Sequence, residues 1–204
     1  MIQISKLFLL LPTLLVTTLC LAQDKKREYE KRIARNEIPE QVLSDVEPLL
    51  KDADKVRYYK EYDGTQISYE VKFLWKGRPL SVEFYEDGHI MDIEELLSLS
   101  DISRSARSGI TKTLENRFSR YRIERLQRQY SAEEDEDEDK DEYNEEVIEE
   151  FMEDDTDDLI IRYEMIAQLK GDGIFGPYEL LFDKNGNLVN QRKVERRSAD
   201  NVLY

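Results

Sequence analysis

Residues 67–75 read Ile-Ser-Tyr-Glu-Val-Lys-Phe-Leu-Trp, and along them large apolar side chains fall at every second position. A period of two is typical of a strand that buries one face of a sheet. Residues 55–62 alternate in the same way, and Asp63-Gly64 joins the two stretches. Asp-Gly between two such runs predicts a hairpin, because glycine accepts a positive φ. We therefore predict an antiparallel pair at this point of the chain.

The meander extends outward from this pair. Two further strands are predicted at residues 79–85 and 89–93, each reached through a turn that contains glycine. Ahead of the sheet, Ile38-Pro39 opens a helical stretch, because apolar residues recur there at helical spacing and proline is tolerated in a first turn. Pro48 lies inside this pattern and predicts a kink or a break into two short helices. The first unit is thus a helical segment packed on four strands.

The same order returns in the second half of the chain. Apolar residues repeat every four positions over residues 103–117 and predict a helix. Four strand-like stretches follow, at residues 120–130, 159–169, 177–182 and 188–194. We therefore expect an α+β fold of two tandem units, each a helical segment packed on a four-stranded antiparallel sheet. Helices would cover one face of each sheet and leave the other face open.

Most of the negative charge lies in one segment. The formal net charge is −15, and residues 133–158 hold 18 acidic residues against a single lysine. Like charges at this density repel, so we interpret residues 131–158 as a disordered acidic insert in the second unit. Val147, Ile148 and Phe151 sit at helical spacing within it and allow a short helix that docks transiently.

The first unit carries a series of landmarks in a fixed order, namely Ile38-Pro39, Tyr69-Glu70-Val71, Gly77-Arg78-Pro79 and Phe84 followed by Asp87-Gly88. This order resembles that of the PepSY-like family of exported bacterial proteins, which shares its unit with tandem beta-lactamase-inhibitor-like domains. The resemblance covers most of residues 37–97 and, less well, residues 101–195, and the acidic insert has no counterpart in it. It implies a small exported binding module, with peptidase inhibition or regulation proposed for relatives, and no catalytic residues.

Residues 1–22 have the order of a secretory signal peptide. A positive charge stands near the start, a mostly apolar run follows, and small residues precede Gln23. The apolar run is shorter than a membrane-spanning helix needs, and the alternatives are a retained N-terminal anchor and lipid attachment at Cys20. Cleavage would remove the single cysteine. The predicted organisation is a signal peptide, a first PepSY-like unit at residues 23–97, and a second at residues 98–204 with the acidic insert 131–158.

Few residues suit catalysis or metal binding. With one cysteine and one histidine, the chain cannot form a zinc cluster, and a Ser-His-Asp triad would depend on His89. His89 follows a turn glycine, where a histidine is usually exposed. Residues 183–187 begin like an EF-hand loop, but Leu188 stands at the sixth position, where that loop needs glycine, so we expect a hairpin turn. We expect no enzyme, no cofactor and no defined metal site.

Four residues are candidates for partner binding. Arg57, Tyr59, Leu74 and Tyr85 have the strand parity opposite to that of the core residues. We therefore predict that they lie on the open face of the sheet. Aromatic side chains and arginine are enriched in protein interfaces. The alternative is that this face takes part in ordinary edge packing or is covered by the second unit.

Together these features predict a periplasmic or secreted, non-enzymatic module that binds a protein or peptide, with inhibition of a hydrolase as one form of that activity. The alternative is a calcium- or cation-responsive envelope protein that acts through the acidic insert, because flexible carboxylates bind calcium weakly. Nucleic acid is disfavoured as a partner, because the chain is acidic and is expected to be exported. No stable membrane insertion is expected after cleavage.

Overall fold

The computed structural model describes residues 25, 26, 28–133 and 139–195. The strands are β1 (Lys25–Lys26), β2 (Glu28–Ile33), β3 (Ala53–Asp63), β4 (Gln66–Trp75), β5 (Arg78–Tyr85), β6 (Ile90–Leu96), β7 (Arg120–Ser131), β8 (Ile160–Gly171), β9 (Ile174–Asp183) and β10 (Leu188–Val194). The helices are the short 3-10 helix η1 (Arg35–Glu37), α1 (Glu40–Leu50), α2 (Arg104–Arg117) and α3 (Lys140–Glu153). None of the helices among these residues is long and apolar enough to cross a membrane.

All the strands belong to one sheet, in the order β1-β10-β9-β8-β7-β6-β5-β4-β3-β2. β6 and β7 pair in an antiparallel register that sets Ile93 opposite Tyr130, so the strands of the two predicted units are continuous. The expected fold of two tandem units, each with its own four-stranded sheet, is therefore wrong. Two separate sheets would each expose the main-chain groups of their edge strands, whereas pairing β6 with β7 satisfies both edges.

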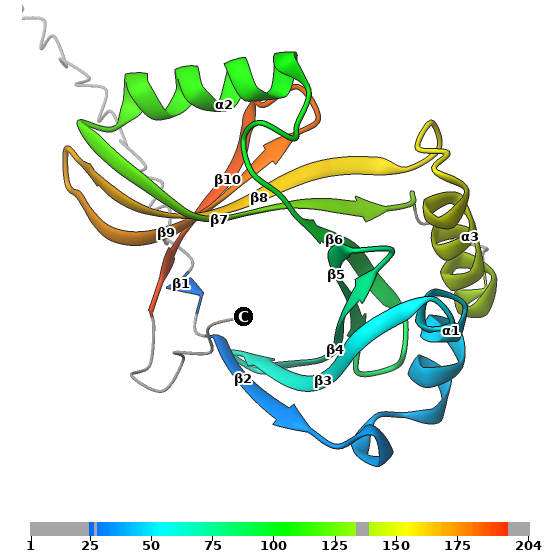
Figure 1. The fold of residues 1–204 in the computed structure, drawn as a ribbon. Helices are drawn as coiled ribbons and strands as arrows, with labels where there is room; N and C mark the ends of the chain where they lie inside the picture. The colour runs from blue at the N-terminus through cyan, green and yellow to red at the C-terminus, as the bar shows by residue number, and fades with distance from the viewer. Residues whose placement is uncertain (1–24, 27, 134–138, 196–204) are drawn as a thin grey trace, which may run out of the picture.

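The N-terminal segment pairs with both outer strands of this sheet. β1 lies parallel to β10, with Lys25 opposite Lys193, and β2 lies antiparallel to β3, with Tyr29 opposite Tyr62. Because β1 and β2 are consecutive in the chain, the sheet curls until its two ends come together (Figure 1). Arg192 of β10 and Asp63 of β3 form an ion pair of 3.4 Å, although the two strands lie far apart in the strand order of the sheet. The sheet thus has a convex outer face and a concave inner face.

The three α-helices lie outside the curled sheet, on its convex face (Figure 1). α1 and α3 cover the strands of the first half, and α2 covers those of the second. Two apolar clusters result, one between α1, α3 and β3–β6, and one between α2 and β7–β9. Val71 and Val82 are fully buried in the first cluster, and Met165 and Leu180 in the second. No helix of the described residues covers the concave face.

Most of the described part of the acidic segment is an ordered helix. The prediction of a disordered insert is wrong for residues 140–153, which form α3, while residues 134–138 lie outside the described residues. Val147, Ile148 and Phe151 are buried on one side of α3, and the rings of Phe151 and Trp75 lie 5.6 Å apart. Most of the acidic side chains face solvent, where their repulsion is screened, so the apolar contacts outweigh it.

The first half of α3 is fixed to the neighbouring elements by Asn144. Its amide nitrogen donates to Asp45 Oδ2 of α1 at 2.7 Å and to the carbonyl of Gly88 at 2.8 Å. Its amide oxygen accepts from the N–H of Ile90 at 2.8 Å. All three bonds lie in a site where Asn144 is 1% exposed, so loss of any one would leave a buried polar group unsatisfied.

α2 meets the turn between β9 and β10 at two glycines. A Cβ added at Gly109 would lie 2.6 Å from the carbonyl oxygen of Asn185 and 2.9 Å from that of Gly186. Gly186 itself has φ of +85° and would place a Cβ 2.3 Å from the carbonyl oxygen of Ala106. The helix therefore approaches this turn as closely as backbone allows, and a side chain at either position would push the two apart.

This contact makes Gly109→Ala a test of the packing of α2. In an exposed helix the change would stabilise by about 1 kcal/mol, but here we expect destabilisation by about 1–3 kcal/mol from overpacking. Ser108→Ala, at the exposed neighbouring position, is the matched control and should be neutral or slightly stabilising. Urea unfolding measures both, and a stabilised Gly109→Ala variant would contradict the close approach.

Candidate functional site

Carboxylates stand opposite one another across the concave face of the sheet. Glu30 of β2 lies opposite Glu61 of β3. Glu70 of β4 lies opposite Glu83 of β5, and Glu83 in turn lies opposite Asp92 of β6. Like charges directly opposite one another destabilise a sheet unless protons or cations neutralise them. This row of acids is therefore the strongest candidate for a functional site.

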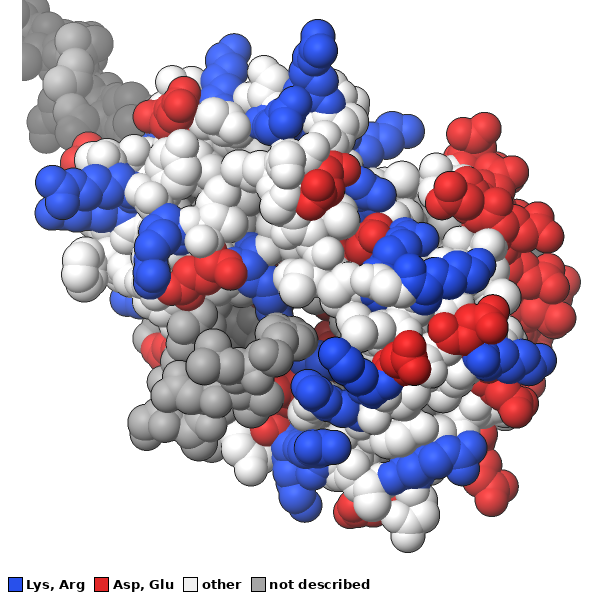
Figure 2. Space-filling model, viewed as in Figure 1, with Lys and Arg blue, Asp and Glu red and all other residues white. Residues whose placement is uncertain are grey.

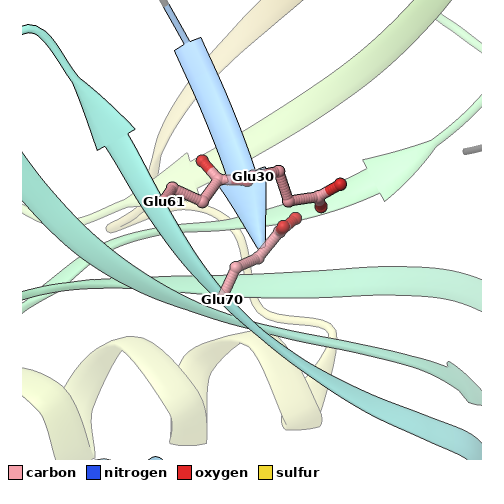
Figure 3. A group of neighbouring side chains, drawn as sticks. All are labelled: Glu30, Glu61 and Glu70. Carbon is pink, nitrogen blue, oxygen red and sulfur yellow. The ribbon is translucent and has the colours of Figure 1, made fainter. Parts of the chain in front are cut away.

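The carboxylates form two overlapping groups. The first comprises Glu30, Glu61 and Glu70, which come from three neighbouring strands and turn their carboxyl groups toward a common region (Figure 3). The second comprises Glu70, Glu83 and Glu94. In each group one carboxylate oxygen from each residue lies within 4.8 Å of those of the other two. Glu70 belongs to both groups and is 2% exposed, so it links them within the molecule.

Lys72 supplies positive charge to the first group. Its ammonium lies 2.8 Å from Glu70 Oε2 and also donates to Glu30 Oε1. Burial acts to raise the pKa of Glu70. The charge of Lys72 and hydrogen bonds from Glu61 and Glu30 have the opposite effect, and together they leave the pKa of Glu70 below its usual value. Burial keeps the pKa of Glu30 raised despite Lys72. The group therefore stays charged at Glu70 and favours a proton at Glu30.

Glu94 is held by donors from two strands. It accepts from Ser81 Oγ at 3.4 Å, from Gln129 Nε2 at 3.1 Å and from Gln127 Nε2. Even so, burial and the negative charge of Glu164 raise the pKa of Glu94 to about 7. The side-chain carbonyl oxygen of Gln127, Oε1, is buried and accepts no hydrogen bond. A buried carbonyl oxygen without a donor is costly, and a cation beside Glu94 would satisfy it.

Glu83 stands at the centre of the row without a compensating charge. Within the described part of the chain its carboxylate makes no hydrogen bond and no ion pair. Burial, and then Glu61 and Glu94, raise the pKa of Glu83 well above its usual value. The next acids along the sheet differ, because Glu164 pairs with Arg125 at 3.1 Å. Among the described residues, Glu83 is thus the acid of the row without a cationic side chain paired with it, between Glu70 of β4 and Asp92 of β6.

Oxygen is the ligand atom that this arrangement offers. Closely spaced carboxylates suit two kinds of ligand, which are protons and hard cations such as Ca²⁺. Either ligand would remove the repulsion between neighbouring strands. The chemistry that this arrangement supports directly is the binding of such a ligand.

The predicted partner-binding residues all stand at strand positions that belong to the concave face. Arg57 lies opposite Lys72, and Tyr59, which is 3% exposed, lies beneath the Lys72 ammonium at 4.8 Å from its ring centroid. Leu74 and Tyr85 lie toward opposite ends of the β4–β5 pair, and Tyr85 is 39% exposed. Tyr59 lies opposite Glu70 of the carboxylate row, and Arg57 lies opposite Lys72, which pairs with that glutamate. Their role in partner binding stays a prediction.

Sequence reasoning missed the acids on this face. Three successive strands each carry one acid at a position that faces the same side as the predicted binding residues. These acids are Glu61, Glu70 and Glu83. That regular recurrence was the available signal. It was overlooked because a glutamate with non-core parity is normally solvent-exposed, and the curl that buries these three depends on pairing at the far ends of the sheet.

The remaining residues considered for chemistry lie elsewhere. The His89 ring lies 4.4 Å from that of Tyr143 on α3, where it takes part in packing. Asp183 accepts hydrogen bonds from the backbone N–H groups of Asn185 and Asn187, so its carboxylate closes the β9–β10 turn. Neither residue belongs to the carboxylate row.

Comparison with family models and with curated protein sequences gave no match. Among solved structures, the chain is similar to a DUF2874 family protein from Bacteroides ovatus, with 15% identity, TM-score 0.47, and coverage of 76% of this chain and 86% of that one. It is also similar to a BLIP-like protein from Bacteroides fragilis, with 12% identity, TM-score 0.46, and coverage of 79% and 89%. A third likeness is to a predicted periplasmic protein from Bacteroides eggerthii, with 12% identity, TM-score 0.45, and coverage of 76% and 87%. At such scores these likenesses carry no functional argument, and the PepSY-like resemblance stays a prediction.

The raised carboxyl pKa values predict a fall in the free energy of unfolding as the pH rises from about 5 to about 8. The folded protein holds protons that the unfolded chain has already released. This stabilisation is complete below the ordinary pKa of 4.5 and is lost as the pH passes the folded value, about 7 for Glu94. Glu94→Gln, which cannot titrate, should reduce the fall by up to about 3 kcal/mol.

Urea unfolding at a series of pH values measures this effect. Glu115→Gln, which makes the same chemical change at an exposed position on α2, is the matched control. An equally steep fall in the Glu94→Gln variant would show that Glu94 does not carry the proton.

Proposed function

We propose that the protein is an exported, non-enzymatic binding module whose concave sheet face binds a hard divalent cation of the Ca²⁺ type. The observation that carries the proposal is the group formed by Glu70, Glu83 and Glu94, which bring one oxygen each within 4.8 Å of one another. Glu83 within it makes no ion pair among the described residues. The ligand follows from the need to neutralise charge that the fold has buried.

The spacing of the oxygens supports a cation of this size. Calcium binds oxygen at 2.3–2.6 Å, so two ligands on opposite sides of the ion stand about 4.6–5.2 Å apart. The carboxylates can therefore enclose an ion with little movement of the backbone. Gln127 Oε1, which is buried and accepts no hydrogen bond, supports the same conclusion independently, because an amide carbonyl is a good calcium ligand.

Cation binding at this site would also couple to the fold. Glu70, Glu83 and Glu94 lie on three successive strands, so an ion shared by them ties these strands together. The same ion would displace the protons that Glu83 and Glu94 hold. At neutral pH, a bound cation would thus take over from these protons in stabilising the curled sheet.

The acidic helix α3 is the second candidate for a cation site. Its carboxylates are numerous, but Glu142, Glu145 and Glu149 are exposed and their positions are not fixed by burial. A site of that kind binds calcium weakly because its ligands are not preorganised. The concave face offers buried oxygens in fixed register, and we therefore place the cation there.

Calorimetric titration of Ca²⁺ at pH 7.5 tests the proposal. We expect saturable binding to the wild-type protein and at least about tenfold weaker binding to the Glu70→Gln/Glu83→Gln variant, because two of the ligands lose their charge. Calcium should also raise the unfolding midpoint of the wild type and leave that of the variant unchanged. Glutamine preserves the size of each side chain and limits the effect on folding.

Glu145→Gln/Glu149→Gln is the matched control, because it removes the same charge from α3. Undiminished calcium affinity in this control supports the concave site. If the control loses calcium binding and the Glu70→Gln/Glu83→Gln variant retains it, the cation site lies on α3 and the proposal fails. The proposal also fails if the wild type binds no calcium at millimolar concentration.

A further inference from the structure

A groove runs between α1 and α3 on the outer surface of the molecule. Its volume is about 500 Å³, which suits a few side chains of a peptide but not a folded domain. Pro48 of α1 and Ile148 and Met152 of α3 contribute its apolar lining. The groove lies on the side of the sheet opposite to the concave carboxylates, so the two sites are separate.

Acidic side chains line the α3 side of this groove at regular spacing. Asp141, Glu145, Glu149 and Glu153 recur at every fourth residue and all belong to its lining. At 1.5 Å per residue, successive carboxylates stand about 6 Å apart along one edge of the helix. Figure 2 shows the acidic side chains gathered at the right edge of the molecule, over α3.

The α1 side of the groove also offers acceptors. Asp45 lines this side of the groove. Burial and the negative charge of Asp141 raise the pKa of Asp45, and the hydrogen bond from Asn144 lowers it by less. Pro48 has no N–H, so the carbonyl of Ser44, four residues earlier, lacks its usual helical donor. Both walls therefore present negative charge or lone pairs around an apolar floor.

We propose that this groove binds a basic, amphipathic helical segment of a partner protein, with Lys or Arg at every fourth residue along one edge and apolar residues beside them. The spacing of its bases would match that of Asp141, Glu145, Glu149 and Glu153. Its apolar residues would cover Pro48 and Met152, which are partly exposed in the groove. Helix-in-groove recognition of this kind uses anchors at i, i+4 and i+7 or i+8.

The charge distribution of α3 favours such a partner. Acids four residues apart repel one another within a helix, and α3 has no base between Asp141 and its C-terminus to relieve them. The C-terminal turn carries Glu149, Glu150 and Glu153, where the helix dipole favours positive charge. Basic side chains from outside the molecule would relieve both effects. The apolar contacts of α3 and Asn144 hold the acidic edge in place until a partner arrives.

Fluorescence anisotropy with a designed peptide tests the proposal. The probe is an 18-residue, fluorescein-labelled helical peptide with Lys at every fourth position and Leu along the adjacent edge. We expect saturable binding to the full mature protein that weakens with added salt. A peptide in which Glu replaces each Lys should not bind, and a scrambled peptide of the same composition should bind at least about tenfold more weakly.

Two variants of α3 with the same change in charge locate the contact. Glu145→Gln/Glu149→Gln alters the groove, whereas Glu142→Gln/Glu150→Gln alters the same helix outside the groove lining. We expect about tenfold weaker binding for the first pair, from the loss of two ion pairs, and little change for the second. Met152→Ser, which removes part of the apolar floor, should also weaken binding. Circular dichroism confirms that each variant retains its helix content.

Each other outcome would overturn the proposal. Equal loss of affinity in the two pairs, or equal binding of the scrambled peptide, would mean diffuse attraction to an acidic surface. Absence of binding at millimolar peptide would mean that the groove is not a docking site. If the protein dimerises, and Glu145→Gln/Glu149→Gln abolishes dimerisation, the occupant is a second copy of the chain and not a partner. None of these results depends on whether the concave face binds calcium.

Discussion

The pleat of the strands directs every second side chain to the face that has no helix, and the curl of the sheet then buries those side chains together. On a flat sheet Glu61, Glu70 and Glu83 would face water at little cost. Here Glu61 and Glu70 are 7% and 2% exposed, and Glu83 is half-buried. A carboxylate in such surroundings must bind a proton, an ion pair partner or a cation. The electrostatics of the molecule follow from this constraint.

Compensation is uneven along the concave face. Toward the C-terminal end, Arg125 pairs with Glu164 and Arg192 pairs with Glu179 at 2.7 Å, so each acid has its own guanidinium. Toward the N-terminal end, Lys72 alone among the described contacts is shared between Glu70 and Glu30. The same architecture therefore holds a neutralised half and an acidic half. A positively charged ligand is therefore attracted to the acidic half.

Local pattern was enough to locate most elements. The strand predicted at 67–75 lies within β4, and the helix predicted at 103–117 matches α2 within one residue. Period-two and period-four patterns depend on neighbours in sequence, which is why these predictions succeeded. The pairing of β6 with β7 and the docking of β1 and β2 on opposite edges are long-range contacts, and no local pattern encodes them.

The acidic segment shows where composition misleads. Charge density predicted disorder, yet the apolar positions of α3, all on one side, decided its structure. The same limit explains the missed site, because parity placed Arg57 and Tyr59 on the correct face but said nothing of burial. Whether a face is buried depends on the curvature of the sheet, and curvature is set by the pairing of β1 with β10 and of β2 with β3.

The molecule thus carries two acidic regions that differ in physical character. Most acids of α3 face solvent and act on other molecules over a Debye length of about 8 Å at physiological salt. The acids of the concave face are buried, are screened little by salt, and respond to whatever neutralises them. Salt should therefore modulate the outer region and leave the inner one nearly unchanged, while pH near 7 should affect the inner region through Glu94. These different responses allow the two regions to serve different ligands within one fold.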